Sequence, residues 1–228
     1  MFWRCAVSES GERRGVDFGE PRTLRDSVAH WVIVAALLLC MINCGGGGRS
    51  PTATGDGGGC GGYSAAESSL YVLPFPVGVS ASVFQDNCGP WTHFGALRYA
   101  TDFALDPGSV AVAARRGEVV AVREHFRDDI DINRGQSNYV MILHADGTVA
   151  YYGHFSQDGV TVEVGAVVAR GERIGFTGAT GYIGPTPHLH IEIQSCQGCA
   201  SIPMTFHNAD PPDTGGLVMG TTYTALPY

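Results

Sequence analysis

Short apolar runs alternate with turn signals along the chain from about residue 70 onward. Val, Ile and Tyr, which favour strands, dominate these runs, and no long segment repeats its apolar positions at the helical period. The pattern predicts an all-β fold, with one antiparallel β-sheet domain over residues 69–210. The runs are YVLPFP (71–76), VAVAARRGEVVAV (110–122), SNYVMILHADGTVAYYGHF (137–155), VTVEVGAVVARGERIG (160–175) and HLHIEIQ (188–194).

One hairpin is marked directly by the sequence ADGT at residues 145–148. An Asp-Gly pair between two strand-like runs is the strongest short signal for such a turn. We therefore expect adjacent antiparallel strands on either side of it. The second of these strands would end at His154.

The run HLHIEIQ (188–194) alternates polar and apolar residues, as a half-buried strand does. Side chains two positions apart point to the same face of a strand, so His188 and His190 would stand side by side, with Glu192 farther along. The leucine and isoleucines between them would pack into the core. Such a histidine pair is either two solvated or hydrogen-bonded side chains or part of a site, and this run alone leaves both interpretations open.

The amino-terminal residues have the features of an export signal. The apolar segment 31–42 is too short to span a bilayer comfortably, follows Arg22 and Arg25, and ends just before Cys44 and a Gly-rich stretch. We interpret residues 1–44 as a lipoprotein leader in which Cys44 carries the lipid. This predicts an exported protein of the cell envelope, periplasmic or on the outer surface. An ordinary secretory signal and a retained anchor are the alternatives, and the true translation start stays open.

Length, charge and composition limit the remaining organisation. The 228 residues suit one sizeable domain, and the formal charge of −8 gives no general attraction to nucleic acid. Residues 45–68 are rich in Gly, Ser, Thr and Ala, which predicts a flexible tether. Residues 211–228 begin with a Pro pair and contain a Gly pair, and we expect a loosely ordered tail there.

The cysteines suggest disulfide bonds. Seven are present, and four of them, Cys60, Cys88, Cys196 and Cys199, lie beyond the leader. An even number of cysteines in an exported protein predicts disulfides, and four cysteines allow three pairings, which the sequence leaves open. The alternative is a zinc site that includes the CxxC pair, although a single CxxC is weak evidence for one.

Two further histidines and an aspartate change the interpretation of His188 and His190. His93 lies nine positions before Asp102, and His154 ends a predicted strand. A catalytic zinc commonly has three ligands from His, Asp or Glu, plus an open position for water. Two histidines and one aspartate meet that requirement, and the other histidines can then move protons.

Four segments resemble, in order and spacing, the lysostaphin-type zinc endopeptidases. This family includes staphylolytic, LytM-like and β-lytic enzymes that cut peptide cross-links in peptidoglycan. The resemblance covers about residues 70–207 and implies a LytM-type β domain with long groove-forming loops. The segments are RYATDFALDPGSVAVAARRGEVVAV (98–122), NYVMILHADGTVAYYGHFS (138–156), VEVGAVVARGERIGFTGATG (162–181) and PHLHIEIQ (187–194).

The resemblance also implies roles for individual residues. One zinc ion per chain would be held by a first histidine, Asp102 and His190, and His154 and His188 would be catalytic. Many family members place the first ligand four positions before the aspartate, where this chain has Arg98, and a guanidinium cannot bind zinc. We take His93 as the substitute ligand.

These features predict an exported, monomeric zinc endopeptidase that hydrolyses peptide bonds in peptidoglycan cross-links. The alternatives are a non-catalytic wall-binding or amidase-activating module with the same fold, and a zinc peptidase that acts on proteins. Tyr182, on the Gly-rich loop before the last strand, either packs that loop or contacts substrate. The DDID run at 128–131 lacks the pattern of an EF-hand and is interpreted as a solvated loop, and His144 as a core or edge histidine.

Overall fold

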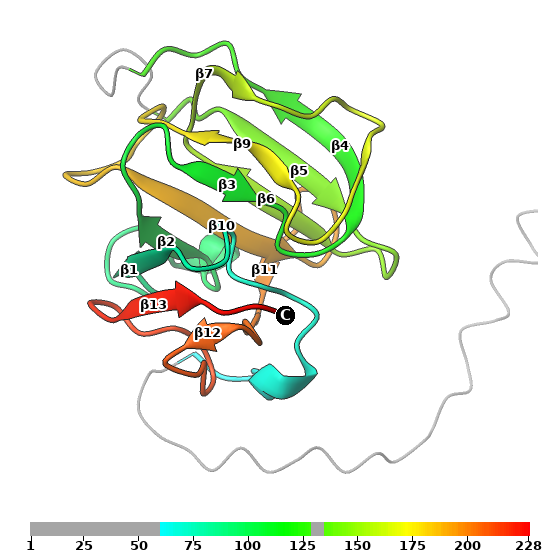
Figure 1. Ribbon diagram of the computed structural model, residues 1–228. Coiled ribbons are helices and arrows are strands. Elements are labelled where there is room, and N and C mark those ends of the chain that lie inside the picture. Colours follow the sequence, from blue (N-terminus) through cyan, green and yellow to red (C-terminus); the bar gives the residue numbers. More distant parts are fainter. Residues whose placement is uncertain (1–59, 129–134) are drawn as a thin grey trace, which may run out of the picture. The chain divides into compact units, whose positions relative to one another are not determined.

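The computed structural model describes residues 60–128 and 135–228 (Figure 1). The predicted leader with Cys44, residues 45–59 of the predicted tether, and the DDID run apart from Asp128 lie outside the described residues. Within the described ranges, no helix is long and apolar enough to cross a membrane.

A ten-stranded antiparallel sheet is the main structure of the described residues. Its strand order is β12-β13-β1-β2-β10-β6-β5-β4-β8, and β11 pairs with β10. Strand β10 therefore has β2 on one side and β6 on the other. The strands are β1 (Ser80–Gln85), β2 (Thr101–Ala104), β4 (Gly117–Arg123), β5 (Tyr139–Leu143), β6 (Val149–Gly153), β8 (Val167–Val168), β10 (His188–Gln194), β11 (Ser201–Ile202), β12 (Ala209–Asp210) and β13 (Thr222–Ala225).

A second sheet of three strands has the order β3-β9-β7, with β3 at Val110–Val112, β9 at Arg173–Thr177 and β7 at Phe155–Val160. The two sheets share one hydrophobic core, in which Phe155 and Ile174 join Tyr152 of β6. The Tyr152 hydroxyl also accepts a 2.8 Å hydrogen bond from the backbone N–H of Ala114, just after β3. The all-β prediction is confirmed, and the structure adds this smaller sheet to the single sheet that was expected.

The division into two sheets has a local cause at His154. Strand β6 ends at Gly153 and β7 begins at Phe155, yet these strands belong to different sheets. His154, between them, has a φ of 69°, in the left-handed region that non-glycine residues seldom occupy. That conformation turns the chain out of the main sheet and leaves the His154 side chain at the junction.

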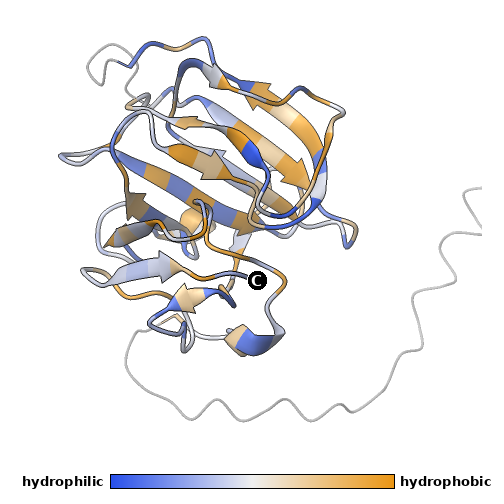
Figure 2. Cartoon of the chain, viewed as in Figure 1, coloured by the Kyte–Doolittle hydropathy of each residue, from blue (hydrophilic) through white to orange (hydrophobic). Residues whose placement is uncertain are grey.

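Helical structure in the described residues is limited to two short 3₁₀ turns, Ala66–Ser68 and Gly95–Leu97. The predicted hairpin is confirmed, because β5 and β6 pair across the Asp-Gly turn with Leu143 opposite Val149. In Figure 2 the strand β10 carries alternating hydrophilic and hydrophobic bands, as its sequence suggested.

The carboxyl-terminal residues differ from the loosely ordered tail that was expected. Strand β13 pairs with β1, and Tyr223 and Ala225 are buried in the core. On the other face, the Thr224 hydroxyl lies 2.8 Å from that of Ser80, a hydrogen-bonded cross-strand pair. The Pro- and Gly-rich segment that precedes β13 obscured this short strand in the sequence.

Both predicted disulfides form, as Cys60–Cys88 and Cys196–Cys199. The first joins the end of the predicted tether to the loop that follows β1, so residues 60–68 are anchored to the domain rather than free. The second closes the turn between β10 and β11, and it joins the two CxxC sulfurs that were an alternative zinc site.

Removing the Cys60–Cys88 disulfide by a double substitution to serine is expected to lower the free energy of unfolding by about 3–4 kcal/mol. This bond joins residues 28 positions apart in the sequence. The entropy that a disulfide removes from the unfolded chain grows with the length of the loop that it closes. The same change at Cys196 and Cys199, which are separated by 3 residues, should cost only about 1–2 kcal/mol. Urea unfolding of the two double variants would test this order, and equal losses would contradict it.

Candidate metal centre

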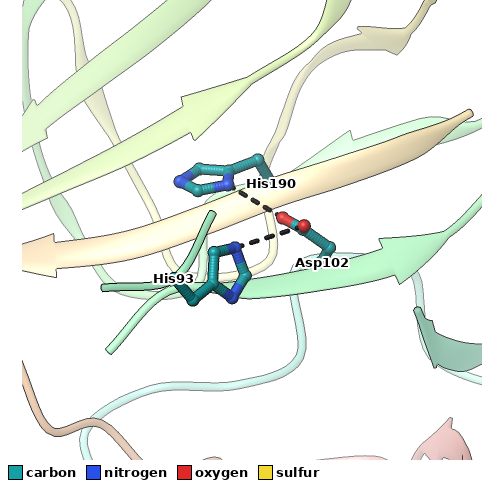
Figure 3. A group of neighbouring side chains, drawn as sticks. All are labelled: His93, Asp102 and His190. Carbon is teal, nitrogen blue, oxygen red and sulfur yellow. Dashed lines mark hydrogen bonds and ion pairs between the residues drawn. The ribbon is translucent and has the colours of Figure 1, made fainter. Parts of the chain in front are cut away.

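Three buried side chains meet where β10 lies beside β2 (Figure 3). The antiparallel register places His190 directly opposite Asp102. Asp102 Oδ1 lies 2.8 Å from Nδ1 of His190, and Asp102 Oδ2 lies 3.2 Å from Nε2 of His93. One ligand atom from each residue lies within 4.8 Å of the others, so the three form a compact set of potential metal ligands.

His93 shows most directly that a cation fits this position. Its Nδ1 lies 2.7 Å from the carbonyl oxygen of Asp86, which can only accept a hydrogen bond, so Nδ1 carries the proton and Nε2 presents a lone pair. That Nε2 is buried, has no hydrogen-bond partner among the described residues, and faces the carboxylate of Asp102. Two acceptors facing each other away from water repel, and a metal ion between them removes the repulsion.

The donor set fits zinc. Imidazole nitrogens and a carboxylate oxygen are ligands that zinc binds, and three of them leave a position for water in a catalytic site. The residues that would hold the ion are His93 through Nε2, Asp102 through its carboxylate and His190 through Nδ1.

The structure places His93, and not Arg98, in this cluster. His93 reaches it from the loop between β1 and β2, where the residue is only 1% exposed. Arg98 is exposed, and its Nε donates a hydrogen bond to Cys88 Sγ at 3.0 Å. The backbone N–H of Cys88 in turn donates to the Arg98 carbonyl at 2.7 Å, so this contact closes the loop that carries His93.

His154 and His188 lie next to the cluster. Their ring centroids are 4.5 Å apart, and Nε2 of His188 lies 3.6 Å from Asp102 Oδ2. Each ring donates a proton from Nδ1 to a backbone carbonyl, His154 to Thr180 at 2.7 Å and His188 to Thr186 at 2.8 Å. These bonds leave Nε2 of both rings as proton acceptors.

The local environment determines which of these groups carry charge. Burial alone would raise the pKa of Asp102, but the charges of His190 and His188 and the hydrogen bond from His190 lower the pKa well below its usual value. The pKa of His190 is raised by Asp102 despite burial. Burial and the neighbouring His188 and His190 lower the pKa of His154 to about 3, and burial also lowers the pKa of His188. At neutral pH, the site therefore combines a carboxylate with two neutral imidazoles beside it.

The lowered pKa of His154 predicts a loss of stability in acid. Unfolded histidine titrates near pH 6.5, so the stabilising effect of a neutral His154 is complete above that pH and is lost as the pH falls toward about 3. Between these values, the wild-type metal-free protein should lose up to about 1.4 kcal/mol per pH unit more than a His154→Gln variant. Urea unfolding of both proteins from pH 7 to pH 4 would measure the difference, and parallel curves would contradict the prediction.

A cleft of about 730 Å³ lies over these residues. Alternate residues of β10, His188, His190, Glu192 and Gln194, line it. All seven residues of β10 are buried, so its polar face lies beneath the cleft instead of facing solvent as in a half-buried strand.

Aromatic side chains also line the cleft. Trp91 and Tyr182 are about half exposed there, and the Phe84 ring lies 5.3 Å from Trp91 and 5.6 Å from His188. Tyr182 thus lines the cleft with half of its surface exposed, and its contact with a substrate stays a prediction. His144 is buried beside Tyr71 and is not among the cleft-lining residues.

Some supporting groups had no signal in the sequence. The carbonyls of Asp86, Thr180 and Thr186 orient three of the imidazoles, and the Ser137 hydroxyl accepts a 2.8 Å hydrogen bond from the backbone N–H of His154. Backbone carbonyls belong to every residue, so only the folded loops reveal which ones act.

Residues 96–202 match the sequence profile described as Peptidase family M23. These residues form an M23 peptidase domain. M23 is a family of metallopeptidases, and the domain contains Asp102, His154, His188 and His190. His93 lies just before the matched residues, and the fold brings it to the M23 site from there.

The chain is similar in sequence to two curated proteins, ShyA and lysostaphin. The peptidoglycan DD-endopeptidase ShyA of Vibrio cholerae is 36% identical over 104 residues, which are 46% of this chain and 22% of ShyA. Lysostaphin of Staphylococcus staphylolyticus is 29% identical over 156 residues, 66% of this chain and 28% of lysostaphin. The chain thus spans about a quarter of the length of these relatives. The solved catalytic domain of lysostaphin from Staphylococcus simulans is 27% identical with a TM-score of 0.38, over 51% of this chain and 79% of that domain.

Proposed function

We propose that this protein is a zinc-dependent endopeptidase that hydrolyses peptide bonds in the cross-links of bacterial peptidoglycan. The observation that carries the proposal is the buried, unpartnered Nε2 of His93, which faces Asp102 at the cleft of an M23 domain and has no hydrogen-bond partner within the described ranges. The names of two relatives, a peptidoglycan DD-endopeptidase and lysostaphin, support this substrate class.

The proposed ligands are His93, Asp102 and His190. A bound zinc would polarise the scissile carbonyl and lower the pKa of water to about 7. The role of the protein at these three positions is to hold the ion in a buried site whose carboxylate stays ionised, as the lowered pKa of Asp102 indicates.

His154 and His188 are the proposed catalytic residues. Both are neutral near pH 7 and present Nε2 as an acceptor at the edge of the ligand cluster. Their Nε2 atoms take a proton from the attacking water and return it to the leaving amine. Because their Nδ1 atoms are held by backbone carbonyls, both rings keep the required tautomer and orientation.

The shape and lining of the cleft suit a peptide of a polymeric substrate. It is open at the exposed rings of Trp91 and Tyr182, and β10 forms its floor. An extended peptide laid along β10 would pass the histidines and contact these rings. A monomeric enzyme is part of the proposal.

Export and lipid attachment at Cys44 are also part of the proposal. The short apolar segment before Cys44 supports them, and the two disulfides of the described residues favour an oxidising compartment outside the cytoplasm. A Cys44→Ser variant should no longer incorporate labelled fatty acid, and it should no longer be found in the membrane fraction. Unchanged incorporation would contradict the assignment of Cys44.

Digestion of purified peptidoglycan sacculi tests the proposed activity. The zinc-loaded protein should release peptides whose new amino and carboxyl termini, identified by mass spectrometry, lie within the cross-link. A His188→Ala protein at the same concentration is the control for contaminating hydrolases. A protein that releases nothing alone but accelerates a separate amidase would support the activator alternative and overturn the proposal.

A further inference from the structure

Glu192 is a buried carboxylate that the proposed mechanism does not use. It lies on β10 and is only 2% exposed. Its Oε1 accepts a hydrogen bond from Gln194 Nε2 at 2.6 Å, whereas Oε2 is buried and has no partner in the part of the chain that the structure describes. An unsatisfied carboxylate oxygen away from water is costly, so a donor is expected to reach it in the working protein.

A histidine ring that can supply such a donor lies on the same face of the same strand. His190 lies two positions before Glu192, and both line the cleft. The Glu192 charge interacts electrostatically with His190. Figure 3 shows that Nδ1 of His190 points to Asp102 and that its second ring nitrogen points away from the aspartate.

Metal binding at Nδ1 determines what the second nitrogen must do. A neutral imidazole that uses Nδ1 as a ligand carries its proton on Nε2. Histidine ligands almost always donate that proton to a carboxylate, a carbonyl or a water, which fixes the ring and strengthens it as a ligand. In the metal-bound protein, His190 therefore needs an acceptor at Nε2.

We propose that Glu192 is the positioning residue of His190, with Glu192 Oε2 accepting the Nε2–H of His190 when Nδ1 binds the metal. The inference rests on the metal site of the proposed function and does not depend on which substrate is cut. It gives Glu192 a role in metal affinity without contact with the reacting atoms.

A carboxylate is required here because two donors converge on residue 192. The Gln194 amide is oriented by its own oxygen, which accepts a 2.8 Å hydrogen bond from the backbone N–H of Gly198. Its nitrogen therefore faces Glu192 Oε1 and leaves Oε2 for His190. A glutamine at position 192 offers only one acceptor oxygen, so one of the two donors would face its NH₂ group.

The test is the zinc dissociation constant of the purified protein, measured by competition with a chromophoric chelator and without substrate. Glu192→Gln should weaken zinc binding by about 10- to 100-fold. Glu124→Gln is the matched control, because the Glu124 carboxylate is also hydrogen-bonded, to the N–H of Val160, but does not line the cleft. It should bind zinc as the wild type does.

Two further readouts separate positioning from a structural role. The melting temperature of the metal-free protein should not fall in Glu192→Gln, because the lost interaction with His190 forms only with metal. The double variant Glu192→Gln/Gln194→Glu should recover most of the lost affinity, since residue 192 can then donate to residue 194 and still accept from His190.

Wild-type affinity in Glu192→Gln would overturn the inference, as would a lower melting temperature of the metal-free variant or no recovery in the double variant. A different result would contradict the proposed function. A protein that binds zinc with this dependence on residue 192 but leaves sacculi intact would contradict the peptidase proposal alone, whereas a wild type that binds no zinc would contradict both.

Discussion

Replacing His93 with alanine is expected to reduce the zinc content of the purified protein from about one ion per chain to nearly none and to abolish hydrolysis of sacculi. His93 contributes one of the three proposed ligand atoms, and Asp102 and His190 alone leave two vacant positions that water would fill. Elemental analysis after dialysis against a weak chelator measures the metal. The variant should remain folded, because His93 lies in a loop and not in a strand.

Arg98 provides the control for this result. The resemblance to lysostaphin-type enzymes would place the first ligand at this position, but the Arg98 side chain is exposed and hydrogen-bonded to Cys88 Sγ. Arg98→Ala should therefore keep its zinc. Arg98→His should not restore metal to the His93→Ala protein, because this position faces the disulfide. Full zinc binding by His93→Ala would show that another group is the first ligand.

The variants His188→Ala and His154→Ala are each expected to retain about one zinc per chain and to hydrolyse the substrate about 10²- to 10⁴-fold more slowly. Neither ring is a proposed ligand, yet each presents a neutral Nε2 beside the ligand cluster. The loss should appear in kcat rather than in KM, because proton transfer assists the reaction and not the binding of the peptide. Release of soluble peptides from a defined cross-linked substrate measures both constants.

The control for these two variants is His125→Ala, since His125 is exposed and is not among the cleft-lining residues. Its rate and metal content should match those of the wild type. If His188→Ala or His154→Ala lost its metal, that histidine would be a ligand and the division of roles would be wrong. If either retained full activity, it would not be catalytic.

The sequence contained the local signals of the fold and the residue types of the site. Alternation in residues 188–194 predicted that His188 and His190 share a face, and the Asp-Gly turn predicted the β5–β6 hairpin. The resemblance to lysostaphin-type enzymes suggested Asp102 and His190 as ligands, and the choice of His93 over Arg98 was a chemical argument about guanidinium. These inferences depend on neighbouring residues or on side-chain chemistry, which a sequence displays directly.

Long-range features required the structure. Nothing in the sequence states that β2 and β10 are neighbours with Asp102 opposite His190, because register depends on how distant strands pack. The left-handed conformation of His154, which separates the two sheets, and the strand β13 after a Pro- and Gly-rich segment were also hidden. The burial of Glu192 follows from the cleft above β10, and periodicity alone left it undecided.

The most direct test of the metal site is an X-ray structure of the protein crystallised with zinc, with data collected above and below the zinc absorption edge. One anomalous peak should lie about 2.0–2.2 Å from His93 Nε2, the Asp102 carboxylate and His190 Nδ1, with His154 and His188 outside bonding distance. A peak bonded to a different set of residues, or no peak between these three side chains at saturating zinc, would contradict the assignment.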